Sequence, residues 1–165
     1  MIRAGILSDT HIQRVTDPFK KLAHRAFSAC DVIFHAGDIT AMEVLEVFGN
    51  RPVYSVRGNM CSTTVQKTLP EHRLITLEGV RIGLCHGAGP RHNIEERMWA
   101  LFPEADCIIY GHTHNPVCEK KGGVLFINPG SFQVTAPHAA PASYALLTID
   151  KNGLDADLHF IRSLR

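Results

Sequence analysis

Five short apolar segments each end in a glycine or a tight turn, and each turn carries a side chain that can bind a metal ion. These segments are the runs that precede Asp9, Asp38, Asn59, His86 and His112. Runs of this length and composition predict buried β-strands. In α/β sheets, ligands gather outside the carboxyl ends of the strands. The pattern therefore predicts that these side chains converge at one edge of an α/β protein.

Helical and hairpin patterns surround these strands. The spacing of apolar residues predicts helices over 18–29, 41–48 and 93–101. Thr40 and Glu43 have the spacing of a capping box for the second of these helices. Hairpins are expected around the turns at 78–79, 120–123 and 151–153. Strand–helix units followed by hairpins predict a mixed α/β sandwich.

Size and charge restrict the class of protein. A chain of 165 residues fits a single domain over residues 1–165. A net charge of +1 argues against a broad nucleic-acid-binding surface. Five scattered cysteines without a Cys-x-x-Cys pair predict reduced thiols in a cytoplasmic protein. The first apolar run is too short for a signal peptide.

One long segment, 122–149, contains no charged residue. Its length could span a bilayer, but three prolines, Pro129, Pro137 and Pro141, interrupt it. We therefore expect buried strands and turns, and no association with a membrane. The segment could also supply a surface for a homo-oligomer, although burial in the core explains it equally well.

The polar residues at the predicted strand ends form a larger donor set than one ion needs. Seven donors are too many for one tetrahedral zinc ion but suit two ions with open positions. Imidazole, carboxylate and amide groups fit manganese, iron, nickel or zinc, with manganese favoured here. Singly, each of these residues is more simply a turn or surface residue. The seven donors are Asp9, His11, Asp38, Asn59, His86, His112 and His114.

The ordered motifs resemble the calcineurin-like metallophosphoesterases, and in particular their small bacterial and archaeal phosphodiesterases. The resemblance implies a four-layer α/β/β/α sandwich of two mixed sheets with a dinuclear site at one edge. It implies that Asp9, His11 and His114 hold one ion, that Asn59, His86 and His112 hold the other, and that Asp38 bridges them. The matching segments are Ser8–His11, His35–Asp38, Arg57–Asn59, Cys85–Gly87, Gly111–His114 and Asn128–Ser131.

Two departures from the family pattern concern the substrate. Relatives commonly continue the Gly-Asn motif with His or Cys and then an acidic residue, whereas Met60 and Cys61 follow here. Met60 cannot act as a general acid, so we expect esters with good leaving groups to react best. Many relatives also have a second His after His-Gly, where this chain has Ala88. Cys61 is expected to be a turn residue and not a ligand.

The expected reaction is hydrolysis of a small phosphate ester by a hydroxide that bridges two divalent ions, with Asn59 and His86 also contacting the phosphate. A phosphodiester is the favoured substrate. A phosphomonoesterase or nucleotidase using the same site is an alternative. A non-catalytic scaffold is a further one, because a vesicle-coat subunit of this fold has lost metal ligands. His35 is as consistent with the core as with support of the ligands. Arg91, His92 and the remaining histidines are expected at the surface or in packing.

Overall fold

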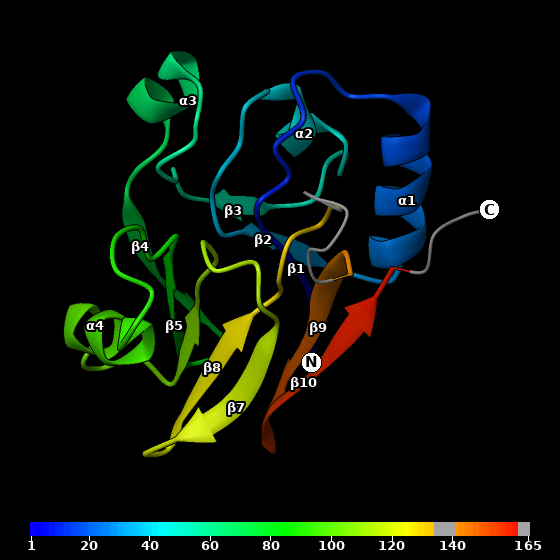
Figure 1. Cartoon of the computed structure of the whole chain (residues 1–165). Helices are drawn as coiled ribbons and strands as arrows, with labels where there is room; N and C mark the ends of the chain where they lie inside the picture. Colours follow the sequence, from blue (N-terminus) through cyan, green and yellow to red (C-terminus); the bar gives the residue numbers. More distant parts are fainter. Residues whose placement is uncertain (134–140, 162–165) are drawn as a thin grey trace.

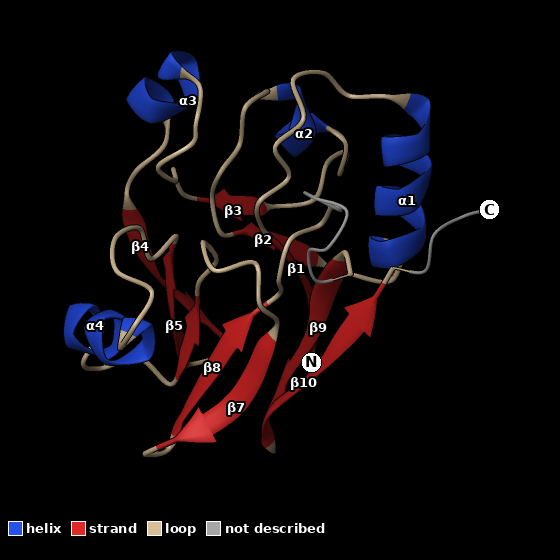
Figure 2. Cartoon of the chain, viewed as in Figure 1, coloured by secondary structure: helices blue, strands red, loops and turns tan. Residues whose placement is uncertain are grey.

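The computed structural model describes residues 1–133 and 141–161. Figure 1 labels the helices and strands along the chain, and Figure 2 colours them by type. The helices are α1 (Asp17–Phe27), α2 (Glu43–Glu46), α3 (Thr63–Thr68) and α4 (Ile94–Leu101). The strands are β1 (Ile2–Leu7), β2 (Val32–His35), β3 (Val53–Ser55), β4 (His72–Leu77), β5 (Val80–Cys85), β6 (Cys107–Ile109), β7 (Val117–Lys121), β8 (Val124–Asn128), β9 (Ser143–Asp150) and β10 (Gly153–Phe160).

The strands form two five-stranded mixed sheets. The first has the order β10-β9-β1-β2-β3, and the second has the order β4-β5-β6-β8-β7. Each sheet contains three parallel strands: β1, β2 and β3 in the first, and β5, β6 and β8 in the second. Antiparallel strands complete both sheets. Because the parallel strands share a direction within each sheet, their carboxyl ends lie at one edge of it.

Three hydrophobic clusters define the layers. One lies between the sheets and includes Ile6, Phe34, Ile82 and Ile127, which are fully buried. A second packs α1 and α2 on the outer face of the first sheet, and a third packs α4 on the outer face of the second. The order helix, sheet, sheet, helix can be followed in Figure 2, where α1 and α4 flank the two sheets. The expected α/β/β/α sandwich of two mixed sheets is confirmed.

Most of the expected elements are present with similar bounds, and the hairpin over 72–85 has the bounds that its pattern predicts. The predicted capping box is wrong. Helix α2 is only four residues long and lacks a side-chain cap, since the Thr40 hydroxyl donates instead to the Ile12 carbonyl at 2.5 Å. The pattern also failed to predict α3, whose single buried residue, Val65, provides no helical period.

Two further observations concern the hairpins and the uncharged segment. Lys120 and Lys121 extend β7, and the turn is made by Gly122 and Gly123, which both have positive φ. Much of the uncharged segment forms β8 and β9, as expected, although 134–140 lies outside the described residues. No helix in the described ranges is long and apolar enough to cross a membrane.

Candidate metal centre

The loops after five parallel strands bring the seven predicted ligands into one cluster, called here the ligand cluster (Asp9, His11, Asp38, Asn59, His86, His112 and His114). Backbone hydrogen bonds join neighbouring loops: Asp9 N–H donates to Gly37 O at 3.0 Å, and Gly111 N–H donates to His86 O at 3.1 Å. The His112 N–H donates to Asp9 Oδ2 at 3.1 Å and so links the two sheets. Residues from both sheets therefore build the cluster.

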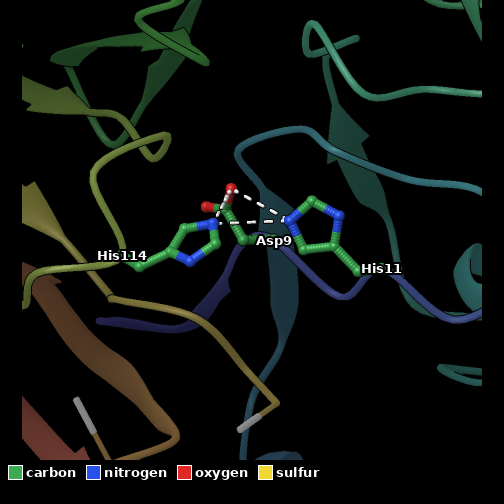
Figure 3. A group of neighbouring side chains, drawn as sticks. All are labelled: Asp9, His11 and His114. Carbon is green, nitrogen blue, oxygen red and sulfur yellow. Dashed lines mark hydrogen bonds and ion pairs between the residues drawn. The ribbon is translucent and has the colours of Figure 1, made fainter. Parts of the chain in front are cut away.

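Asp9, His11 and His114 form the first group of donors (Figure 3). His114 Nε2 lies 3.1 Å from Asp9 Oδ1 and 3.4 Å from His11 Nε2. His11 Nε2 lies 3.7 Å from the same Asp9 oxygen. One atom from each of the three side chains thus faces a common point, with all the pairs within 4.8 Å. These three side chains together are able to hold one cation.

The second group contains Asp38, Asn59, His86 and His112. Asn59 Oδ1 lies 3.1 Å from both His86 Nε2 and His112 Nδ1. His86 Nε2 is 3.3 Å from Asp38 Oδ1. The atoms that could bind a metal again face one another.

The two carboxylates lie between these groups. Asp38 directs Oδ1 towards His86 and Oδ2 towards His11, with the second distance 3.6 Å. Asp9 Oδ1 also reaches 4.0 Å from His86 Nε2, and Asp9 belongs to both three-residue groups that could hold an ion, Asp9–His11–His114 and Asp9–Asp38–His86. Both Asp9 and Asp38 are therefore placed to share their charge between two ions.

The cluster has a buried floor and an open rim. Asp9, Asp38 and His86 are almost fully buried, with exposed fractions of 0, 2 and 2%. His11, His112 and His114 are partly exposed, and Asn59 is exposed. Solutes can therefore reach the donors from the rim, while the charge of the two carboxylates is held in a buried environment.

Hydrogen bonds fix the orientation of two imidazoles. His86 Nδ1 is 2.8 Å from the Ala36 carbonyl, so Nδ1 carries a proton and the ring directs Nε2 to the cluster. His112 has the opposite arrangement, because Nε2 is 3.0 Å from the Gly89 carbonyl and Nδ1 faces Asn59. Bonds of this kind orient histidines that bind metals.

The backbone of the cluster is itself unusual. Five of its seven residues have a positive φ: Asp9, His11, Asp38, His112 and His114, with values from 46 to 68°. Non-glycine residues rarely adopt this left-handed region, although Asp and His tolerate it better than most. Such conformations cost about 1–3 kcal/mol each and tend to accumulate at functional sites. In two of the loops these residues stand two positions apart, Asp9 with His11 and His112 with His114.

Mutual electrostatics keeps the carboxylates ionised. Burial by itself raises the pKa of Asp9, but His11, His114 and His86 together lower this pKa far below its ordinary value. Burial also opposes ionisation of Asp38, yet its hydrogen bonds with His86 and the Met60 N–H leave its pKa lowered. The hydrogen bond to Asp9 raises the pKa of His11.

The same carboxylates act on His86, whose burial by itself would lower its pKa. Asp38 and Asp9 outweigh that burial and raise the pKa of His86 above its ordinary value. Two buried negative charges thus attract positive charge, which either protons on the histidines or divalent cations can supply. Oxygen and imidazole nitrogen donors suit divalent transition metals. The chemistry of the donor set therefore fits two bound ions.

Several residues outside the predicted ligand set hold the loops in place. Asn128 Nδ2 donates to Gly111 O at 2.9 Å, and Ser131 Oγ donates to Asp9 O at 2.9 Å. Both belong to the Asn-Pro-Gly-Ser motif, for which the sequence suggested no separate role. The Ser8 hydroxyl donates to Asp9 Oδ2 at 2.5 Å.

Cys61 is more than the turn residue that was expected. Its Sγ accepts hydrogen bonds from Ile39 N–H at 3.3 Å and from Gly58 N–H at 3.0 Å. The buried thiol thereby joins the loop that carries Asp38 to the loop that carries Asn59. No sequence pattern indicates this role, because it depends on a contact between segments 22 residues apart.

The remaining histidines divide as their surroundings dictate. His35 is fully buried and accepts the Gly37 N–H at 3.2 Å, so it supports a loop of the cluster without joining the donors. Arg91 and His92 are exposed, as are His24 and His72, and His159 stacks on Tyr144. His138 lies outside the described residues.

Several known proteins are similar to this chain in sequence. The model of the calcineurin-like phosphoesterase superfamily domain matches residues 2–152. A probable metallophosphoesterase from Methanothermobacter thermautotrophicus is 36% identical over 157 residues, which cover 93% of this chain and 90% of that protein. The phosphodiesterase YfcE of Escherichia coli is 38% identical over 107 residues, which cover 59% of this chain and 53% of YfcE.

A solved structure shares the fold across nearly the whole chain. Wild-type Vps29 from Entamoeba histolytica, complexed with Zn²⁺, has a TM-score of 0.72 and 21% identity, covering 96% of this chain and 99% of that one. This likeness shows the fold alone.

Proposed function

Because the chain belongs to the calcineurin-like phosphoesterase superfamily, we propose that it hydrolyses phosphate diesters with two divalent cations held by the ligand cluster. The observation that carries the proposal is the convergence of seven oxygen and nitrogen donors around two buried carboxylates. The name of YfcE, a phosphodiesterase, favours a diester over a monoester.

The proposed ligand assignment follows the two groups of donors. Asp9, His11 and His114 would hold one ion, while Asn59, His86 and His112 would hold the other. Asp38 would be shared by the two ions, because each of its oxygens faces a different group. When bound, two such cations lower the pKa of water towards neutrality and stabilise the negative charge of the phosphoryl transition state.

The residues of the chain position the substrate on the exposed side of the cluster. Asn59 lies at the open rim and His86 beneath it, so their side chains can orient a phosphate oxygen as well as bind an ion. The buried floor excludes water from the charges of Asp9 and Asp38. Met60, whose side chain is 60% exposed, has no proton to give a leaving group. Esters with good leaving groups should therefore react fastest.

Two alternative functions use the same fold. A phosphomonoesterase or nucleotidase would need the same ions and would differ only in substrate. A non-catalytic scaffold of this fold could hold metal as well, and bound metal is present in the Zn²⁺ complex of Vps29, which shares the fold. Metal binding alone therefore does not separate an enzyme from a scaffold, and turnover must be measured.

The test is hydrolysis of bis(4-nitrophenyl) phosphate and of 4-nitrophenyl phosphate with manganese, nickel or a chelator present. We expect turnover that requires metal and a higher kcat/KM for the diester. Absence of metal-dependent turnover of either ester would contradict the proposal. A higher kcat/KM for the monoester would favour the phosphomonoesterase.

Replacement of the bridging carboxylate tests the assignment within the site. Asp38→Asn should lower kcat by at least about 100-fold, since even residues that only support metal ligands contribute 10–100-fold. Asp155→Asn is the matched control, because Asp155 lies exposed on β10, away from the cluster. Equal rates for the two variants would refute the role of Asp38.

A further inference from the structure

A cavity of about 430 Å³ opens directly beside the ligand cluster. Asn59 and His86 line it, so the two residues proposed to orient the phosphate belong to the cavity as well. Sites for small organic ligands have volumes of about 300–1,000 Å³. A phosphate held at the cluster therefore has room for an organic group on this side.

The charges in the wall of the cavity are already compensated. Apart from His86, its charged residues are Arg57 and Glu71. Arg57 Nη2 lies 3.3 Å from Glu71 Oε2, and Arg57 Nη1 donates to the Gln66 carbonyl at 3.0 Å. A second anionic group of a substrate would have to compete with Glu71 for this guanidinium. These two side chains thus add no net charge to the wall.

Other residues of the wall are apolar. Met98 and Leu101 come from α4, and Ala88 follows the His86 loop. Leu101 is 42% exposed, although it lies on an amphipathic helix whose Met98 is buried. In Figure 1, α3, which carries Gln66, and α4 lie on the same side of the molecule as β4. A flat apolar group bound in the cavity beside Ala88 and Met98 would cover the exposed side chain of Leu101.

We propose that this cavity binds one organic substituent of the phosphate ester, and that this substituent is uncharged and about the size of an aromatic ring. The proposal rests on the proposed function for the position of the phosphate. It adds the class of substrate: diesters in which one group is an aryl or similarly sized ring. It also assigns Ala88 and Leu101 to the selection of that group.

The test measures binding without turnover. Methylphosphonate and phenylphosphonate carry the same head group, lack a scissile ester, and differ in the presence of a ring. Isothermal titration calorimetry with the manganese-loaded protein should show that phenylphosphonate binds about tenfold tighter, as burial of an apolar ring predicts. Equal affinities, or no binding of either compound, would overturn the proposal.

Variants of the wall locate the ring. Ala88→Trp should fill the cavity and reduce the affinity ratio of the two phosphonates to about one. Ala100→Trp is the matched control, since Ala100 is exposed on α4 but does not line the cavity. Leu101→Ser is a second variant, which should reduce the ratio about threefold without adding bulk. A ratio that is the same in all four proteins would place the ring elsewhere and overturn the proposal.

A charged ring tests the role of Arg57. We expect 4-carboxyphenylphosphonate to bind no tighter than phenylphosphonate, because Glu71 already pairs with Arg57. Tighter binding of the carboxylate would overturn the preference for an uncharged group. A ring preference without turnover of esters would support the cavity and reject the proposed function. Turnover of esters without a ring preference would support the proposed function and reject the role of the cavity.

Discussion

At the scale of single residues, the ligand cluster is built from conformations that most residues avoid. His112, with φ at 68°, illustrates the cost, since its side chain faces Asn59 only because the backbone adopts the left-handed region. A right-handed helical or extended backbone would direct the imidazole elsewhere. The left-handed conformation of His112 therefore lowers the stability of this loop, and it also places the imidazole in the cluster.

This cost can be measured in the metal-free protein. His112→Gly should be about 1 kcal/mol more stable than His112→Ala, because glycine adopts a positive φ without the steric penalty of a Cβ. Denaturant unfolding gives both values. The control pair is Lys21→Gly and Lys21→Ala, at an exposed position of α1. There the glycine variant should be less stable than the alanine variant by about 1 kcal/mol. The same sign at both positions would contradict the argument.

His35 is a buried group whose charge is suppressed. Burial lowers its pKa from 6.5 to about 3, so the folded protein keeps the imidazole neutral while the unfolded chain takes up a proton below about pH 6.5. Its contribution to stability is therefore complete above that pH and is lost progressively as the pH falls towards 3.

A neutral replacement isolates this effect. Between pH 7.5 and 5.5, the wild type should lose about 1.4 kcal/mol more unfolding free energy than His35→Gln, each measured with a chelator present. His24→Gln, at an exposed position on α1, should follow the wild type. Parallel pH profiles for the wild type and His35→Gln would mean that His35 is protonated in the folded state.

At the scale of elements, loops and turns carry more specific information than the strands. The β4–β5 turn places Glu78 at φ 50° and Gly79 at φ 81°, as in the type I′ turns that suit the twist of a hairpin. Glycine meets this requirement readily, but glutamate does not. The hairpin forms with the bounds that the sequence predicts because apolar residues of both strands, such as Ile75 and Ile82, are buried in the core between the two sheets.

The first turn position offers a prediction about stability. Glu78→Asn should stabilise the protein by about 0.5–1 kcal/mol, because asparagine tolerates a positive φ and the position is exposed. Thermal unfolding of Glu78→Asn and Glu78→Ala checks this prediction. The alanine variant should not be stabilised, because alanine does not favour a positive φ. A loss of stability in the asparagine variant would show that Glu78 makes a contribution other than its turn conformation.

At the scale of the whole molecule, the cluster connects two sheets that otherwise contact each other mainly through an apolar core. Asp9, His11, Asp38 and Asn59 follow strands of the first sheet, whereas His86, His112 and His114 follow strands of the second. Ions bound by both sets would tie the sheets together. Binding to the folded state alone stabilises that state according to the concentration of free metal.

This linkage predicts a global effect. Manganese at about 100 times its dissociation constant should raise the free energy of unfolding by about 2.7 kcal/mol, and a chelator should reverse the increase. His114→Ala should weaken the effect, since it removes a donor contributed by the second sheet. His159→Ala, on β10 and outside the cluster, should keep it. An unchanged melting temperature with metal in every protein would argue against binding to the folded state.

The sequence by itself determined the mixed α/β class, the order of most elements and the residues of the cluster, and its resemblance to a known family added the two mixed sheets. These features depend on local patterns: apolar runs specify strands, and polar residues directly after them are carried to the sheet edge. The motif Gly111–His114 and the turns before Asp38 and Asn59 are informative for this reason.

Only the tertiary structure decided how far the donors lie from one another, how Cys61 joins two loops, and where the cavity lies. Each of these features depends on distances between segments far apart in the chain, such as the 3.1 Å between Asn59 and His112, which are separated by 53 residues. Helix α3 escaped prediction because Val65 is its single buried residue, and the capping box predicted for α2 is wrong because the Thr40 hydroxyl donates to the Ile12 carbonyl of another loop. The residue types at the strand ends identify the donors, but the packing of the two sheets sets the distances between them.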